Sequence, residues 1–335
     1  QYQPAKQQTI TPKQDSEYIY LRDGRRLSYL DHQPQSYSQS KRSTDTSFQQ
    51  STTQQTIVLL HNLMGSGKEL PPGAHELIKQ LKVRIVVPER PGYGNSDIHP
   101  ERSHQDWTKD LEELLNELKL DKVFVIAHSI GGPYALALAE FLPSRIERIA
   151  MVNAMPRIDD IMACKEVPTL ASAVMRSLRY APFFIEPILK MAVGKDIEHF
   201  YGQQLNYIRP TQEGRAADIN LLNTSQYRHY AIANLKQSSK QGISIWASEL
   251  KLSFSQLEFS ISNKKVDYQF WHGEHDDVIP IDAAINLAQN VNTSSFKRMS
   301  YETHFLFARH FSDIVEHLLT PEKVLQRSDC IEQII

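Results

Sequence analysis

The chain has few cysteines, little net charge and no long apolar segment. Its 335 residues include only Cys164 and Cys330, which are too few for a disulfide framework and match no metal-ligand spacing. The formal net charge is −2, with no long basic or acidic run, so we expect no nucleic-acid partner. No apolar run reaches the roughly 20 residues needed to cross a bilayer, so we expect no stable membrane span.

Sequence signatures of cofactor binding are also missing. Neither the lysine-containing phosphate loop nor the six-residue dinucleotide fingerprint occurs. His272-Gly-Glu-His275 lacks the spacing of the helical zinc signature. We therefore expect neither a cofactor nor a metal ion. Ala181–Val193 is the nearest approach to an apolar helix, and we interpret it as buried or substrate-facing, with attachment to a membrane surface as the alternative.

Two features bear on the compartment. The chain begins at Gln1 rather than methionine, so removal of a leader or another N-terminal segment is one expectation. Asn223 and Asn292 each begin an Asn-Thr-Ser glycosylation triplet, although roughly one or two such triplets arise by chance in a chain of this length. The apolar fraction of 41% is ordinary for a soluble globular protein. The start of the chain and the triplets leave the compartment open; we expect a soluble protein, with a cytoplasmic location favoured over export.

What the chain does contain is a buried strand that leads into a candidate nucleophile. Val123 to Ala127 is a continuous apolar run, typical of a central parallel strand covered on both faces. It continues as Ala-His-Ser-Ile-Gly, a Gly-x-Ser-x-Gly nucleophile elbow with Ala127 in place of the first glycine. Such an elbow holds its serine in a strained conformation and needs small flanking residues. The pattern predicts that Ser129 lies at a sharp strand-to-helix turn.

Strands and helices alternate around this elbow. Tyr18 to Leu30 reads as a hairpin with an Asp-Gly turn. Further strands are expected at 56–60, 83–87, 123–127, 146–152, 266–271 and 295–299, with helices at 73–81, 103–118, 132–141, 282–289 and 305–319. This alternation predicts an α/β fold with a mostly parallel central sheet and helices on both faces.

Composition and periodicity also divide the chain into segments. We expect a disordered lead-in at 1–16, a core at 17–155 and 266–320, a helical cap at 156–265 inserted after the sixth strand, and a tail at 321–335. Residues 35–55 are almost entirely Ser, Gln and Thr, which indicates a solvated low-complexity loop.

An activated serine needs a histidine to accept its proton and a carboxylate to orient that histidine. Two segments that follow late strands carry these residue types, His272 to Pro280 and Ser300 to Phe305. Taken with the elbow, they resemble the α/β-hydrolase fold superfamily over roughly Glu17 to Leu319, in the family order Ser, Asp, His. The resemblance implies a helical lid and a triad of Ser129 as nucleophile, Asp276 as orienting carboxylate and His304 as general base.

Rivals remain for two of these roles. The family commonly has a glycine three residues before the acid and a proline four after it, which favours Asp276, but Asp277 and Glu274 are alternatives. His304 is preferred over His310 and His317 because it precedes the last helix, whereas both of the others are expected inside it.

The resemblance also implies an oxyanion hole built from the backbone N–H groups of Ile130 and Leu63. At position 62 the family usually has glycine, whereas this chain has asparagine, a residue that tolerates positive φ. His61 and His128 flank the site, and we interpret them as structural. Pro91-Gly-Tyr-Gly-Asn-Ser96 resembles a turn of the same family rather than a phosphate loop.

These residues predict a cofactor-independent serine hydrolase that cleaves a carboxylic ester of a small to medium, largely apolar acyl substrate. Methionine and aromatic residues in the 156–265 region support an apolar pocket. The same triad also serves amide, thioester and carbon–carbon bond hydrolases. A relative that releases halide or opens an epoxide would need aspartate at position 129. The alternative from another class is a non-catalytic, receptor-like member that binds a small apolar ligand.

Overall fold

The computed structural model describes residues 16–34, 54–164, 177–194, 196–207, 215–262 and 264–320. Most of the predicted lead-in, most of the low-complexity loop and the whole predicted tail therefore lie outside the described residues, as does Cys330. Among the described residues, none of the helices combines the length and the apolarity needed to cross a bilayer.

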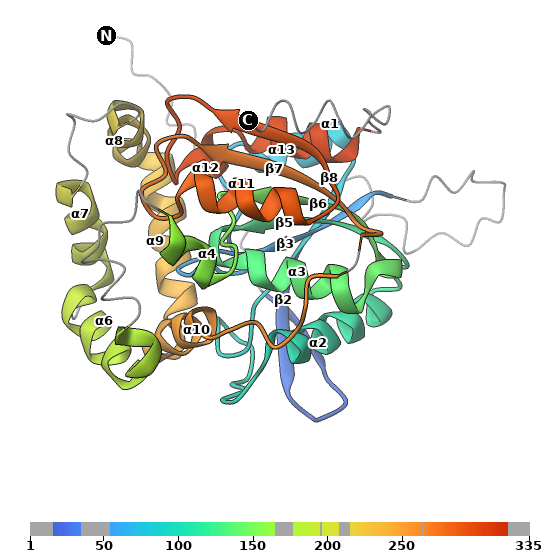
Figure 1. Cartoon of the computed structure of the whole chain (residues 1–335), viewed down its shortest axis with the longest axis horizontal. Helices are drawn as coiled ribbons and strands as arrows, with labels where there is room; N and C mark the ends of the chain where they lie inside the picture. The colour runs from blue at the N-terminus through green and yellow to red at the C-terminus, as the bar shows by residue number, and fades with distance from the viewer. Residues whose placement is uncertain are drawn as a thin grey trace, which may run out of the picture.

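The described residues form an eight-stranded sheet with the order β1-β2-β4-β3-β5-β6-β7-β8 (Figure 1). The pairs β1–β2 and β2–β4 are antiparallel and the others are parallel, which confirms the predicted mostly parallel sheet. The strands are β1 Glu17–Tyr20, β2 Arg26–His32, β3 Thr56–Leu60, β4 Arg84–Pro88, β5 Val123–His128, β6 Ile146–Val152, β7 Asp267–Gly273 and β8 Thr293–Met299.

The central strands are buried because helices cover both faces of the sheet. In β3, Ile57 and Leu59 face one core, and Val58 and Leu60 face the other, as strand alternation requires. Helices α1 (Ala74–Leu81) and α13 (Phe311–Leu319) contribute to the first core. Helices α2 (His104–Glu117), α3 (Gly132–Phe141) and α11 (Ile281–Asn290) contribute to the second. Continuous apolar strands are therefore accommodated without exposed apolar faces.

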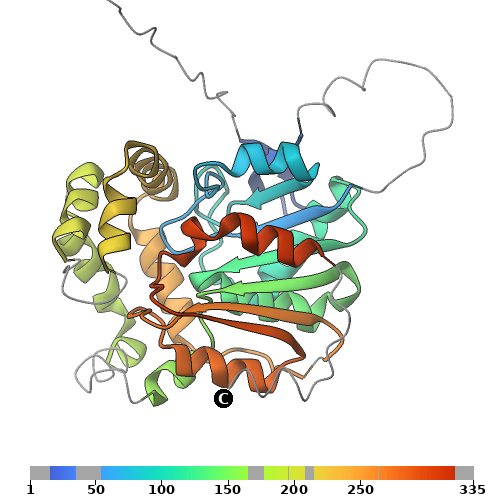
Figure 2. The ribbon, with the colours of Figure 1, turned by 90° about the horizontal axis from the view of Figure 1, so that it is seen from above.

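A helical region lies between β6 and β7, after the sixth strand, and stands beside the sheet in both views (Figures 1 and 2). Its described helices are α4 Ile158–Ala163, α6 Ile185–Val193, α7 Ile197–Tyr207, α8 Arg215–Asn223, α9 Ser225–Ser238 and α10 Ser244–Phe254. Helices α6 to α10 pack on an apolar cluster that includes Phe200, Leu235 and Trp246, whereas Ile158 and Ile161 of α4 pack in a cluster with Ile130 of the elbow. The sequence prediction of several short helices here agrees with this arrangement.

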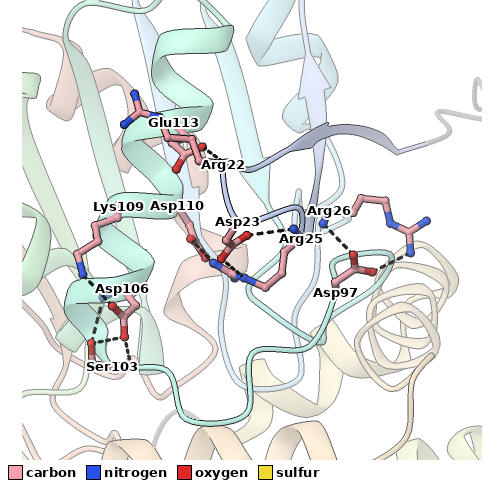
Figure 3. A network of polar contacts seen from close by, with 10 residues as sticks. All are labelled: Arg22, Asp23, Arg25, Arg26, Asp97, Ser103, Asp106, Lys109, Asp110 and Glu113. Atoms are coloured by element: carbon pink, nitrogen blue, oxygen red, sulfur yellow. Dashed lines mark hydrogen bonds and ion pairs between the residues drawn. The ribbon is translucent and has the colours of Figure 1, made fainter.

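The β1–β2 hairpin is held to the rest of the core by charged side chains (Figure 3). In its turn, Arg25 donates two hydrogen bonds to Asp110 of α2, at 2.8 and 2.7 Å. The carboxylate of Asp97 accepts the backbone N–H of Arg26 at 2.8 Å and pairs with its guanidinium. A capping box between Ser103 and Asp106 begins α2. The hairpin therefore stays with the sheet although β1 itself is largely exposed.

The prediction of one helix over 305–319 is wrong. The structure has two helices, α12 (Leu306–Arg309) and α13, and the backbone of His310 between them departs from helical geometry. The His310 ring bridges Glu302 at 2.9 Å and Asp313 at 3.1 Å, which holds the break in place. His310 therefore lies between two helices rather than inside one.

Candidate active site

Ser129 follows the last residue of β5 and begins the 3-10 turn Ser129–Gly131, after which α3 starts. Its φ is 53°, in the left-handed region that non-glycine residues rarely occupy. Strain of this kind costs on the order of 1–3 kcal/mol and persists only where the surroundings enforce it. The predicted sharp turn is therefore present, with its serine in the expected conformation.

The elbow needs small residues because the backbone of β3 and of the segment after β6 comes very close to it. A Cβ atom at Gly131 would lie 2.6 Å from the carbonyl oxygen of Leu60 in β3. At Gly132, a Cβ atom would lie 2.1 Å from the carbonyl oxygen of Met155. Both positions therefore require glycine for packing, although neither has a positive φ.

The structure brings Ser129, His304 and Asp276 together in one hydrogen-bonded chain. Nε2 of His304 lies 3.0 Å from Oγ of Ser129, and Nδ1 of His304 lies 2.9 Å from Oδ2 of Asp276. Both distances lie within the reach that nucleophile, base and orienting group require. The three residues come from the carboxyl ends of β5, β7 and β8, which lie at the same edge of the sheet.

The Asp276 carboxylate is buried and has a full set of donors. Backbone N–H groups of Val278 and Ile279 donate to its Oδ1, both at 2.9 Å. Nδ2 of Asn153 donates to its Oδ2 at 2.5 Å, beside Nδ1 of His304. Sequence reasoning missed Asn153, whose only signal is a polar residue at the end of a buried strand, and its φ of 43° is another strained conformation.

Charge interactions within this chain of residues shift two pKa values in opposite directions. Burial opposes ionisation of Asp276, but the charge and the hydrogen bond of His304 outweigh it and lower the pKa of the carboxyl. Burial likewise opposes the imidazolium of His304, but Asp276 outweighs it and raises the histidine pKa above its ordinary value. The pair thus favours an ionised aspartate beside a basic histidine.

The rivals predicted from sequence lie elsewhere. Asp277 is exposed at the rim of the cavity, and Glu274 pairs with Arg298. His310 lies between α12 and α13, where its ring pairs with Glu302 and Asp313. Nε2 of His317 lies 3.1 Å from Oγ of Ser295. Among these candidates, Asp276 and His304 are the ones in line with Ser129.

The loop after β3 is held so that one backbone donor remains free. Nη2 of Arg90 donates to the carbonyl of Asn62 at 3.0 Å, and the hydroxyl of Tyr93 donates to the carbonyl of Leu63 at 2.9 Å. In a trans peptide the N–H points opposite to the C=O, so Arg90 turns the N–H of Leu63 away from itself. Among the hydrogen bonds of the described residues, this N–H has no acceptor. Leu63 and Ile130 both line the cavity that contains Ser129.

Asn62 fits its position for a reason other than the expected one. Its φ is not positive. Instead, its Oδ1 accepts the backbone N–H of Met64 at 2.7 Å, and its Nδ2 donates to Glu69 at 3.1 Å. The side chain therefore closes the loop on itself, a role that glycine could not perform.

A cavity of about 610 Å³ is lined by Ser129 and His304. The helical region supplies much of the apolar wall of this cavity. Helices α4, α7, α8, α9 and α10 contribute, in that order, Ile161, Phe200, Leu222, Tyr227 and Phe254. Asn62, Asn234 and Thr303 are among the polar residues that line it. In the part of the chain that the structure describes, no group of three or more His, Cys, Asp or Glu side chains is placed to hold a metal ion.

Residues 55–311 match the family model described as alpha/beta hydrolase fold, which is most of the chain. The chain belongs to the α/β-hydrolase fold family. Solved structures show the same fold, and at this low sequence identity the similarity concerns the fold alone. A bromoperoxidase from Bacillus anthracis is 18% identical with a TM-score of 0.62, over 91% of this chain and 99% of that one.

Curated relatives of this α/β-hydrolase-fold chain match shorter stretches. The sn-1-specific diacylglycerol lipase ABHD11 of Danio rerio is 29% identical over 119 residues, 33% of this chain and 38% of the relative. The esterase YbfF of Escherichia coli is 29% identical over 113 residues, 32% of this chain and 44% of the relative. The chain thus spans less than half the length of either relative.

The structure also shows a link between the His304 loop and the helical region that sequence reasoning missed. Asp218 of α8 is fully buried, and its Oδ1 accepts hydrogen bonds from Thr303 and Arg309, both at 2.7 Å. Thr303 is the residue before His304, so a helix far from the serine in sequence restrains the loop that carries the base. The sequence gives no signal of this contact, because Thr303 and Arg309 are 85 and 91 residues away from Asp218 in the chain.

Proposed function

We propose that this protein is a serine hydrolase that cleaves carboxylic esters through an acyl-enzyme on Ser129. The observation that carries the proposal is the hydrogen-bonded line from Oγ of Ser129 through His304 to Asp276, with both distances at or below 3.0 Å. The curated relatives named as an esterase and a lipase support the same class of reaction.

In the first half of the reaction, Oγ of Ser129 attacks the ester carbonyl carbon while Nε2 of His304 accepts the hydroxyl proton. Asp276 stabilises the imidazolium, and the N–H groups of Ile130 and Leu63 donate to the oxyanion that forms. The carbon–oxygen bond to the alcohol then breaks, and His304 returns its proton to the leaving oxygen. The product of this half is a serine ester and a free alcohol.

In the second half, water replaces the alcohol. His304 removes a proton from the water as the oxygen attacks the acyl carbon, and the same oxyanion donors stabilise the tetrahedral intermediate. Collapse of the intermediate breaks the bond to Oγ of Ser129, which regains its proton from His304. The acid leaves and the enzyme returns to its starting state.

The cavity supports an acyl substrate of small to medium size with a largely apolar body. A volume of about 610 Å³ falls within the roughly 300–1,000 Å³ of small-molecule pockets. Because the helices between β6 and β7 supply much of its apolar wall, we assign them the role of a lid. Their apolar side chains would then set the preferred length of the acyl chain.

Labelling by a fluorophosphonate probe tests the proposal. We expect the folded wild-type protein to be labelled, and Ser129→Ala to remain folded but unlabelled and to lose esterase activity by at least about 10³-fold. The control is Ser248→Ala, which removes an exposed serine of α10 whose hydroxyl donates to the carbonyl of Ser244 in the same helix. Folded wild-type protein that the probe does not label would overturn the proposal.

A panel of p-nitrophenyl esters of increasing acyl length defines the substrate class. An apolar cavity of limited volume predicts that kcat/KM rises with chain length and then falls once the acyl chain exceeds the cavity. Labelling by the probe without activity on any ester would instead indicate an amide or carbon–carbon bond as the substrate.

A further inference from the structure

Glu69 is a fully buried carboxylate beside the candidate site, and the proposed reaction does not use it. It lies in the loop between β3 and α1, close to the turn that contains Asn62 and Leu63. A Cβ atom at Gly65 would lie 1.5 Å from its Oε2, so the chain approaches this carboxylate as closely as glycine allows.

Three donors surround the Glu69 carboxylate. The backbone N–H of Asn62 donates to Oε2 at 2.9 Å, and Nδ2 of Asn62 donates to Oε1 at 3.1 Å. Nδ1 of His128 is bonded to the same Oε1. A carboxylate is an acceptor only, so His128 carries its proton on Nδ1 in this contact.

These donors belong to the two segments that supply the proposed oxyanion hole. Asn62 is the residue before Leu63, and His128 lies two residues before Ile130. Glu69 therefore connects the loop after β3 to the elbow after β5 through a single side chain. The ring of His128 also stacks on Phe307 at 4.3 Å and faces the ring of His304 at 6.1 Å.

We propose that Glu69 is a positioning residue that sets the spacing of the two oxyanion donors, Leu63 and Ile130. This inference rests on the proposed function. Oxyanion stabilisation depends on donors held in advance where the charge develops, and a displacement of one donor weakens the transition state more than the bound substrate. Glu69 performs this role through Asn62 and His128, without touching the substrate.

Asparagine at position 62 and the carboxylate at position 69 act as a pair. The Asn62 side chain connects the carboxylate to the N–H of Met64, and the carboxylate also accepts the N–H of Asn62, so the peptide group before Asn62 and the one after Leu63 are both held. Glycine at this position would lack that connection. Glu69 can therefore hold the loop rigid because Asn62 carries a side chain that bonds to it.

The decisive variant is Glu69→Gln, which keeps the shape of the side chain. Glutamine offers one acceptor oxygen and one donor nitrogen, so at least one of the three donors loses its partner and one segment is released. We expect kcat per active site to fall about tenfold to a hundredfold, with KM changed less than twofold. Titration with the fluorophosphonate probe counts the active sites, so loss of folded protein does not enter the result.

The matched control is Glu89→Gln. Glu89 is also fully buried and accepts hydrogen bonds from neutral donors. Ser28, Asn95 and Gln237 lie outside the loop between β3 and α1, and the remaining donor, Gly67, lies in that loop but beyond the Asn62–Met64 turn. We expect this variant to lower stability while kcat per titrated site stays within twofold of wild type. A lower kcat per titrated site in Glu69→Gln than in Glu89→Gln would therefore result from where the carboxylate lies, because both carboxylates are equally buried.

A second readout is inhibition by a trifluoromethyl ketone, which forms an oxyanion when the serine adds to it. We expect Glu69→Gln to weaken this inhibition by the same factor as kcat/KM. If Glu69→Gln does not fold, Asn62→Ala replaces it, since it removes only the side-chain connection, and the same fall in kcat is expected.

The outcomes separate the two proposals. An active wild-type enzyme whose variant turns over at the wild-type rate per titrated site overturns the role of Glu69 and leaves the serine hydrolase intact. A variant with fewer active sites but unchanged turnover at each also overturns it, because Glu69 is then structural only. A wild-type protein that the probe does not label overturns both.

Discussion

Asp276 and Asp277 are neighbours in the chain, yet their surroundings differ. Asp276 is 6% exposed and accepts hydrogen bonds from two backbone N–H groups, Asn153 and His304. Asp277 is exposed, and its charge contributes less than that of Asp276 to the raised pKa of His304. These contacts support Asp276 as the proposed orienting residue and leave Asp277 a smaller electrostatic effect.

This difference predicts distinct results for two conservative variants. We expect Asp276→Asn to lower kcat by about 10⁴-fold, because the amide favours the wrong tautomer of His304. Asp277→Asn removes a charge that favours the imidazolium, so the pKa of His304 falls and the acidic limb of kcat/KM moves to lower pH. In wild type that limb lies above pH 6.5, because the pKa of His304 is raised from its ordinary value of 6.5.

Measurement of kcat/KM against pH for the three proteins checks this prediction. A large loss of activity in Asp277→Asn with an unchanged limb would transfer the orienting role to that residue.

At the scale of elements, the position of the serine depends on how closely α3 approaches β3 and the segment after β6. The carbonyl of Met155 leaves no room for a side chain at Gly132, whereas a Cβ atom at Gly202 in α7 would meet no heavy atom within 4 Å. The same substitution at these two glycines therefore has opposite effects.

We expect Gly132→Ala to destabilise the protein by about 2 kcal/mol or more, because backbone must move to admit the methyl group. Gly202→Ala should stabilise it by roughly 0.5–1 kcal/mol, since alanine in a helix interior loses less conformational entropy on folding. Urea denaturation of the two variants and wild type measures both changes. A Gly132→Ala protein as stable as wild type would contradict the close contact at the elbow.

At the scale of the whole molecule, several histidines are buried in neutral form. Burial lowers the pKa of His32 to about 4, with a smaller effect of the neighbouring His75. Burial likewise lowers the pKa of His61 and of His272. Each of these groups is more readily protonated in the unfolded chain than in the folded protein.

Stability should therefore fall with acidity in a defined window. A histidine with a lowered folded pKa contributes its full stability above the unfolded pKa of about 6.5, and loses it as pH falls towards the folded value. For His32, 5% exposed, a shift from 6.5 to about 4 corresponds to about 3 kcal/mol between those limits. We expect His32→Gln to reduce the slope of unfolding free energy against pH in this window.

Chemical denaturation at a series of pH values between 7 and 4 provides the measurement, with His199→Gln, which removes an exposed histidine of α7, as control. An identical slope in wild type and His32→Gln would show that His32 is not held neutral by burial.

Local pattern was enough to predict the strands, the elbow and the presence of helices after β6, because apolar periodicity and turn residues act over short stretches. The chain order Ser129, Asp276, His304 was enough to nominate a triad, whose catalytic role stays a prediction. The break at His310 was missed because it depends on Glu302, and helical periodicity continues across it. Asn153 and Asp218 were missed because their partners lie far away in the chain.

The fold class and the candidate nucleophile follow from local sequence patterns, because continuous apolar strands pair in the interior and the Ala-His-Ser-Ile-Gly pattern after one of them is typical of a tight strand-to-helix turn. The surroundings of that serine depend on contacts between segments that are far apart in the chain. Glu69 and His128 are 59 residues apart in sequence, and they meet because β3 and β5 are neighbours in the sheet. The physical reason is that a buried carboxylate must find its donors in three dimensions, and no local pattern records which ones they are.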